Sequence, residues 1–60
     1  MNGIFKRFIM ENPQMKGDIE SYTSTSASEL DIYLKNGITL KLELNILNNR
    51  LEIFDIETPD

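Results

Sequence analysis

The chain of 60 residues lacks cysteine, histidine and tryptophan altogether. Without cysteine there is no disulfide, and without cysteine and histidine there is no zinc site of the usual Cys/His type. Histidine is also the side chain that proteins use most often for general acid–base catalysis, and cysteine is an intrinsically strong nucleophile. We therefore expect no enzymatic function, no cofactor and no metal site.

Long apolar runs are missing too. No stretch approaches the length of a membrane span, and the N-terminal "NGIFKRFIMENP" has its basic pair in the middle of its apolar residues, whereas a secretory signal has basic residues ahead of a continuous apolar run. We expect no association with a membrane. Because a reducing compartment permits a chain without cysteine, the sequence favours a cytoplasmic location.

Basic residues are scarce outside the N-terminal segment. Up to Gly17 three basic residues stand against one carboxylate, whereas from Asp18 onward nine carboxylates stand against three basic residues. The net charge is −4. An acidic body repels a phosphate backbone, so direct binding of nucleic acid is not expected, and a partner would be a protein or a second copy of the chain.

The length predicts a single small domain spanning residues 1–60. A chain of this size buries only about 60% of its unfolded surface, and one such core supplies roughly 3 to 5 kcal/mol of stability. With disulfides excluded, the remaining ways to supplement the core are oligomerisation and binding to a larger partner.

The N-terminal segment is predicted to be a helix over about residues 2–11. Its apolar residues follow the spacing of one helical stripe, and they are Ile4, Phe5, Phe8 and Ile9. The "NP" that follows is a stop signal. Two turns bury too little area for stable membrane anchoring, so the stripe is expected to cover a sheet.

The segment from about 18 to 26 is rich in serine and threonine and has alternating spacing with little apolar area. It fits either an edge strand or a polar loop. Residues 27–36 also have two interpretations. Ser26 and Glu29 fit the capping box of a helix, but Leu30, Ile32 and Leu34 alternate with polar residues, which favours a strand over about 29–35.

The register of the following hairpins comes from the "NG" and "NN" turns. A three-residue loop with a left-handed Gly37 pairs Leu34 with Ile38 and places every apolar residue on one face, giving a strand over about 38–47. A two-residue Asn48-Asn49 turn pairs Ile46 with Leu51 and begins a strand over about 50–57, followed by a tail at 58–60. The predicted fold is α+β, with a short N-terminal helix packed on a three- or four-stranded antiparallel β-meander.

The last strand, "LEIFDI", has apolar residues on both faces. On the register above, Leu44 lies opposite Ile53 and Asp55 lies opposite Leu42 on the core face, while Phe54 and Ile56 emerge on the polar face. A bulge near Ile53 would turn both pairs inward. Without a bulge the strand needs cover on both sides, which the Ser/Thr segment, a second copy or another protein could supply.

Carboxylates gather on the polar face of the predicted sheet. The register places Glu29 opposite Glu43 and Asp31 opposite Lys41, and two such carboxylates can raise one another's pKa or hold a hard cation. A bare sheet face has no cleft that excludes water, so a solvated polar face with one ion pair and one repulsive pair is the favoured interpretation.

Tyr33 and Phe54 share this polar face and are surrounded by carboxylates. Those carboxylates are Glu29, Asp31, Glu43 and Glu52. Aromatic residues within a charged rim are typical of a protein-binding patch. Our hypothesis is a small acidic non-enzymatic interaction module, an inhibitor or regulator of a basic protein surface. The alternative is a structural subunit of a symmetric homodimer or larger homo-oligomer, formed through an edge strand or through Phe54 and Ile56 of the last strand.

Overall fold

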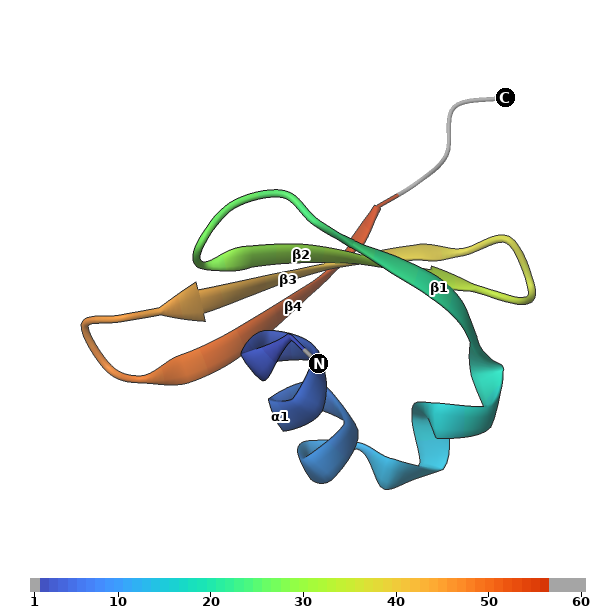
Figure 1. Cartoon of the computed structure of the whole chain (residues 1–60), viewed down its shortest axis with the longest axis horizontal. Helices are drawn as coiled ribbons and strands as arrows, with labels where there is room; N and C mark the ends of the chain where they lie inside the picture. Colours follow the sequence, from blue (N-terminus) through green and yellow to red (C-terminus); the bar gives the residue numbers. More distant parts are fainter. Residues whose placement is uncertain (1, 57–60) are drawn as a thin grey trace.

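The computed structural model describes residues 2–56, which form one α-helix, a short 3-10 helix and a sheet of four antiparallel strands (Figure 1). The elements in chain order are α1 (Gly3–Glu11), η1 (Pro13–Asp18), β1 (Ile19–Ser24), β2 (Glu29–Leu34), β3 (Thr39–Asn45) and β4 (Arg50–Ile56). The strands follow one another across the sheet in chain order. This arrangement confirms the predicted α+β class with an antiparallel β-meander. The predicted tail at 58–60 lies outside the described residues.

Asn2 begins α1 as its N-cap. Its Oδ1 accepts hydrogen bonds from the backbone N–H groups of Ile4 (2.8 Å) and Phe5 (3.2 Å), two of the donors that the first turn of a helix leaves without a partner. At the other end, the Asn12 N–H donates to the Phe8 carbonyl. Pro13 has no N–H with which to continue the ladder, so the chain turns into η1 there.

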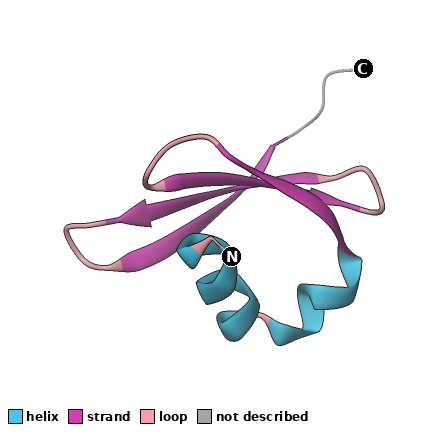
Figure 2. Ribbon diagram, viewed as in Figure 1, coloured by secondary structure: helices cyan, strands magenta, loops and turns pink. Residues whose placement is uncertain are grey.

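The helix covers only one face of the sheet, so the molecule has two layers (Figure 2). The core between them consists of Ile4, Phe8, Leu30, Ile32, Leu34 and Leu42. The alternation in β2 is complete, because its even-numbered residues are buried while Glu29, Asp31 and Tyr33 are half-buried or exposed. The period of two that is visible in the sequence therefore decides which face of the sheet receives the helix.

The Ser/Thr segment is a strand rather than a loop. Among the described strands β1 pairs only with β2, so it forms one edge of the sheet, and its register shifts between Ile19 and Ser21 at a bulge. The β2–β3 register is the predicted one, with Ile32 opposite Leu40. The three-residue loop between them has Gly37 at φ 91°, the left-handed conformation that the prediction requires.

The β3–β4 register differs from the prediction by two residues. Leu44 lies opposite Leu51, and Leu42 lies opposite Ile53, so the connection is four residues long instead of two. Side-chain oxygens of asparagine stabilise the longer turn, since Asn45 Oδ1 accepts from Leu47 N and Asn48 Oδ1 accepts from Arg50 N, both at 3.0 Å. These local bonds are the ones that asparagine commonly forms in turns.

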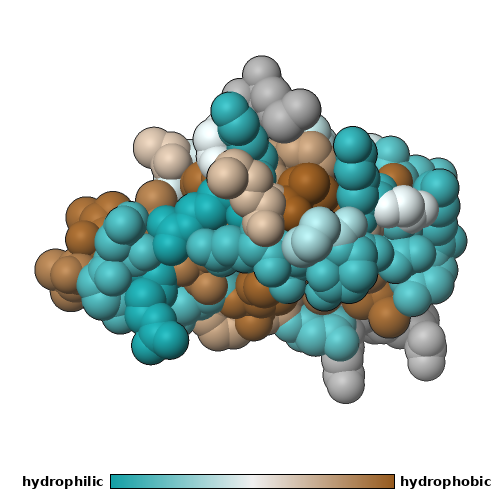
Figure 3. Space-filling model, turned by 90° about the horizontal axis from the view of Figure 1, so that it is seen from below, coloured by the Kyte–Doolittle hydropathy of each residue, from teal (hydrophilic) through white to brown (hydrophobic). Residues whose placement is uncertain are grey.

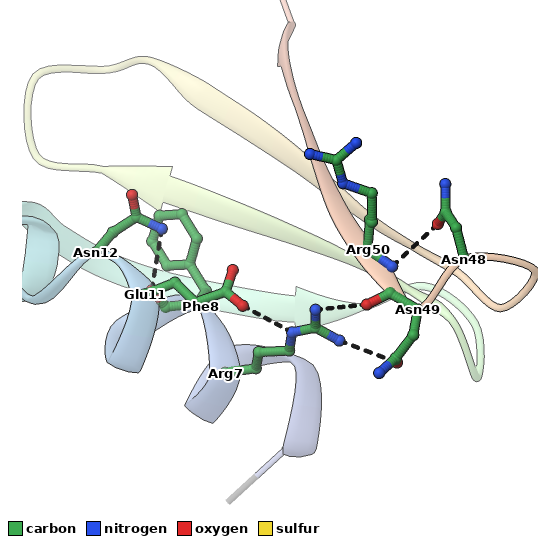
Figure 4. A network of polar contacts seen from close by, with 7 residues as sticks. All are labelled: Arg7, Phe8, Glu11, Asn12, Asn48, Asn49 and Arg50. Carbon is green, nitrogen blue, oxygen red and sulfur yellow. Dashed lines mark hydrogen bonds and ion pairs between the residues drawn. The ribbon is translucent and has the colours of Figure 1, made fainter.

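A polar contact links α1 to the turn between β3 and β4 (Figure 4). Arg7 Nη2 donates to the Asn49 carbonyl at 2.6 Å and Arg7 Nη1 donates to Asn49 Oδ1 at 3.2 Å, while Arg7 Nε pairs with Glu11 at 2.9 Å. Asn49 itself has φ 55°. The guanidinium therefore adds a polar contact between the helix and this hairpin, whose Leu44 and Leu51 also pack against the core.

Candidate functional site

The outer face of the sheet, which we define as the odd-numbered residues of β2 and β3 and the even-numbered residues of β4, is the side turned away from α1. Nothing within residues 2–56 covers it, because α1 packs on the opposite face. All six residues that the sequence predicts for partner binding lie on this face, and they are Glu29, Asp31, Tyr33, Glu43, Glu52 and Phe54. The alternation of each strand is sufficient to bring them together.

Tyr33 and Phe54 lie on either side of the central strand β3. Tyr33 is opposite Thr39, and Phe54 is opposite Lys41. Tyr33 is 37% exposed and Phe54 is 44% exposed. Each aromatic ring therefore leaves a substantial part of its surface in water, which is the condition for contact with a partner.

Three carboxylates form a row across the outer face. Glu29 is opposite Glu43, and Glu43 is opposite Glu52. Like charges that face one another across strands repel. Neighbouring groups offset this repulsion at the two ends of the row. Glu29 forms an ion pair with Lys41, and Glu52 Oε1 accepts a hydrogen bond from Asn45 Nδ2 at 3.0 Å. Within the described residues the central Glu43 has no ion pair, so it is available to a positively charged partner.

Lys41 forms its ion pair diagonally, which corrects the predicted pair. Asp31 is its cross-strand neighbour, but Lys41 Nζ lies 3.0 Å from a carboxylate oxygen of Glu29. Hydrogen bonds from Lys41 and then from Ser26 Oγ, together with the lysine's charge, lower the pKa of Glu29. The same hydrogen bond and the charge of Glu29 raise the pKa of Lys41. For Glu29, the lysine outweighs the carboxylate repulsion that the sequence suggested.

Lys41→Met is expected to raise the pKa of Glu29 toward its ordinary value, and an NMR titration of the side-chain carboxyl carbon measures it. The pKa of Glu29 is lower in the folded state than in the unfolded state. Such a carboxyl stabilises the folded state at pH values above its unfolded pKa, and this stabilisation disappears as the pH falls through the folded pKa. The variant should therefore show a weaker loss of unfolding free energy in acid. Lys35→Met is the control, and an unchanged Glu29 titration in Lys41→Met would contradict the pairing.

The last strand is apolar on both faces without a bulge. Its pairing with β3 is continuous from Arg50 to Ile56, so the suggested bulge near Ile53 is absent. Ile53 points to the helix side and is 45% exposed, while Phe54 points to the outer face. The described residues leave both side chains uncovered. The side chain of Ile56, which the sequence also suggests for an oligomer interface, lies outside the described part of the structure.

Two apolar features were missed in the sequence. Ile46 and Leu47 are 80% and 94% exposed at the β3–β4 turn, because the two-residue shift moves Ile46 out of the core pairing. The end of the molecule at this turn is brown in Figure 3. The second feature is a hollow between α1 and β1. The sequence contains no sufficient signal for this hollow, because it forms only when α1 and β1 lie side by side.

The described residues contain no group of three or more acidic or metal-ligating side chains placed to hold a metal ion. Among the helices of residues 2–56, none has the length and apolar character needed to span a bilayer. Comparisons of the chain with protein-family models, with curated proteins and with solved structures find no significant match.

Proposed function

We propose that the chain is a small, non-enzymatic protein-interaction module whose outer face binds a basic surface of another protein. The observation that carries the proposal is an uncovered sheet face on which two half-exposed aromatic residues lie among four carboxylates. Aromatic residues supply contact area at low cost in side-chain entropy, and the charged rim selects a partner of opposite sign.

The charges of the outer face support a basic partner. Lys41 is already paired with Glu29, and Arg50 lies at the margin of the face beside Asn45. Asp31 and Glu43 form no ion pair within residues 2–56. A net charge of −4 reinforces the attraction at long range and makes nucleic acid an unsuitable partner.

The size of the face indicates a weak and salt-sensitive complex. Four strands of six or seven residues, about 4.8 Å apart, present a face of roughly 20 by 20 Å. A standard interface buries about 800 Å² on each partner, so this one is at the low end and relies on charge steering. Such a module suits a regulator or inhibitor that occupies a basic surface, including one that otherwise binds nucleic acid. A cytoplasmic location belongs to the proposal, because the chain needs no disulfide.

Tyr33→Ala combined with Phe54→Ala is expected to abolish the capture of basic proteins by the immobilised chain while leaving its circular dichroism unchanged. The loss is expected because both substitutions remove exposed contact area and neither touches the core. Ile46→Ala combined with Leu47→Ala removes a similar exposed apolar area away from this face, so it serves as the matched control.

Capture should weaken steeply as salt is raised, because an attraction between exposed charges is screened. Capture that is equal for the wild type and the Tyr33/Phe54 variant would exclude the outer face, and capture that is insensitive to salt would exclude a partner chosen by charge.

We propose self-association through the free edge of β4 as a second candidate function. Within residues 2–56, β4 pairs only with β3, and its neighbouring residues Ile53 and Phe54 are exposed on opposite faces. A symmetric pair of edges would bury both side chains and add main-chain hydrogen bonds. The expected result is an unfolding midpoint that falls on dilution, and Ile53→Lys should remove that dependence. A monomer in sedimentation equilibrium over the whole dilution series would contradict this candidate.

A further inference from the structure

An apolar groove of about 710 Å³ lies between α1 and β1, on the helix side of the sheet. Its apolar lining is Phe5, Ile9, Met10, Ile19 and Tyr22. The rings of Phe5 and Tyr22 stack with centroids 4.2 Å apart and an interplanar angle of 16°, which joins the helix to the strand. Met10 is 72% exposed, and a flexible thioether side chain adapts readily to an incoming apolar group.

The groove extends to the free edge of β1. Four consecutive residues of that strand, Ile19 to Tyr22, contribute to its lining. The bulge interrupts the alternation between Ile19 and Ser21, but Ser21 and Tyr22 follow it and point to opposite faces, so a hollow that both of them line reaches the edge of β1. No strand within the described residues pairs with this edge, because β1 is the first strand of the sheet and has only β2 as a neighbour.

The main-chain groups of Tyr22 and Ser24 point to this free edge. Thr25 N donates to the Glu29 carbonyl of β2 at 3.1 Å, so the polar groups of Thr25 face β2. Along a strand the main-chain groups of successive residues alternate in direction, which turns those of Ser24 and Tyr22 away from β2. An extended segment that lies beside β1 would find these hydrogen-bonding groups without a partner strand.

The rim of the groove is positively charged. Lys6 and Lys16 both contribute to it, against the single carboxylate of Glu20. The ion pairs formed within residues 2–56 are Arg7–Glu11 and Lys41–Glu29, so neither rim lysine is neutralised. This local charge is opposite to that of the outer face and to the net charge of the chain.

We propose that this groove and the β1 edge together bind an extended acidic peptide, which adds a fifth strand to the sheet. The peptide's main chain pairs with Tyr22 and Ser24. Its apolar side chains on the helix side enter the groove, and its acidic side chains on the same side reach Lys6 and Lys16. This is the recurring mode in which main-chain bonds supply affinity and a pocket for alternate side chains supplies specificity.

The charges favour such a peptide over a second copy of the chain. Two copies that paired their β1 edges across a two-fold axis would bring both rim lysines of each copy to the same interface, and like charges that face one another oppose association. An acidic segment neutralises them instead. The proposed site is on the other side of the sheet from Tyr33 and Phe54, so it does not depend on the function proposed for the outer face.

The test is an NMR titration of the isotope-labelled full chain with a synthetic peptide, acetyl-ETLTLTE-amide. Its odd-numbered residues place two leucines between two glutamates on one face of a strand. We expect amide shifts at Tyr22, Ser24 and Met10, with an affinity in the millimolar range or tighter, about that of a small interface. The peptide acetyl-KTLTLTK-amide has the same leucines and the opposite charge, and it should bind at least about tenfold more weakly.

Two variants separate edge pairing from charge. Ser24→Pro removes an N–H that points away from β2, so the variant should keep the fold and lose about tenfold or more in affinity for the acidic peptide. Ser24→Ala keeps this N–H and should bind the peptide with unchanged affinity. Lys6→Glu with Lys16→Glu should abolish binding. The control, Lys35→Glu with Arg50→Glu, makes the same change in net charge away from the groove and should bind the acidic peptide as tightly as the wild type does.

The outcomes that overturn the proposal are specific. No amide shifts up to about 5 mM peptide would exclude the site. Equal binding of the acidic and basic peptides would exclude recognition by Lys6 and Lys16, and unchanged binding by Ser24→Pro would exclude strand addition. Shifts confined to Tyr33 and Phe54 would assign the peptide to the outer face. Loss of the outer-face partner in the Tyr33/Phe54 variant, with peptide binding retained, would show that the two sites are separate.

Discussion

Phe8→Ala is expected to leave the chain largely unfolded at room temperature. Phe8 is 1% exposed and lies in the core with Leu30, Ile32 and Leu42, which are fully buried. Truncation of a buried phenylalanine costs about 3 to 5 kcal/mol, because it removes apolar contacts and leaves a cavity. The total free energy of unfolding of a domain of this size is about as large as this cost, so the variant should have almost no stability left.

Far-ultraviolet circular dichroism and a thermal unfolding curve measure this effect. Met10→Ala is the matched control, because Met10 is on the same helix but is 72% exposed, and it should unfold close to the wild-type temperature. A cooperative transition of Phe8→Ala near the wild-type midpoint would mean that α1 contributes little to the core.

Gly37→Val is expected to destabilise the chain by roughly 1 to 3 kcal/mol, the usual cost of a strained backbone conformation. Gly37 has φ 91° in the β2–β3 loop, and a β-branched residue is strongly disfavoured there. A Cβ at this position would meet nothing within 4 Å, so the cost comes from the backbone conformation and not from a collision. The loop also sets the register of the two central strands through the bond from Leu34 N to the Ile38 carbonyl.

The free energy of unfolding from urea denaturation should follow the backbone preference of each residue. Gly37→Asn should lose less than Gly37→Val, because asparagine tolerates positive φ better than other residues with a side chain. Gly17→Val is a control, since Gly17 has equally open space but no positive φ. Equal losses for Gly37→Val and Gly17→Val would show that the loop conformation is not what stabilises the hairpin.

Alternation in the sequence was sufficient to predict the faces of the sheet. Leu30, Ile32 and Leu34 are buried as their period of two indicates, and the glycine turn defines their pairing with β3. The helix versus strand ambiguity at residues 27–36 was resolved by packing. The capping-box residues Ser26 and Glu29 do bond to each other, at 3.1 Å, but they do so in the turn before β2.

The register of the last hairpin could not be obtained from alternation. A shift of two residues leaves every side chain on the same face, so Leu44 can face Leu51 or Ile53 with the same hydrophobic pattern. What decides between the two is the hydrogen bonding of Asn45 and Asn48 within the turn, together with the contact from Arg7. The last of these joins residues that are far apart in the sequence.

The composition of the outer face was predictable, whereas the pairing of its charges was not. The strand period alone places Tyr33 with the four carboxylates. The choice of Lys41 between Asp31 and Glu29 depends on side-chain rotamers and on Ser26, which strand position does not specify. The peptide groove was not predictable because it requires α1 and β1 to be placed side by side in space.

The contact between Arg7 and Asn49 also bears on the order in which the chain assembles. A meander pairs each strand with the next one in the chain, so the hairpins close short loops and can form early. The guanidinium contact spans 42 residues, and it cannot form until the final turn exists. The apolar stripe of α1 can already pack on β2 and β3 before that turn exists, so the guanidinium contact is the last one to join the helix to the sheet.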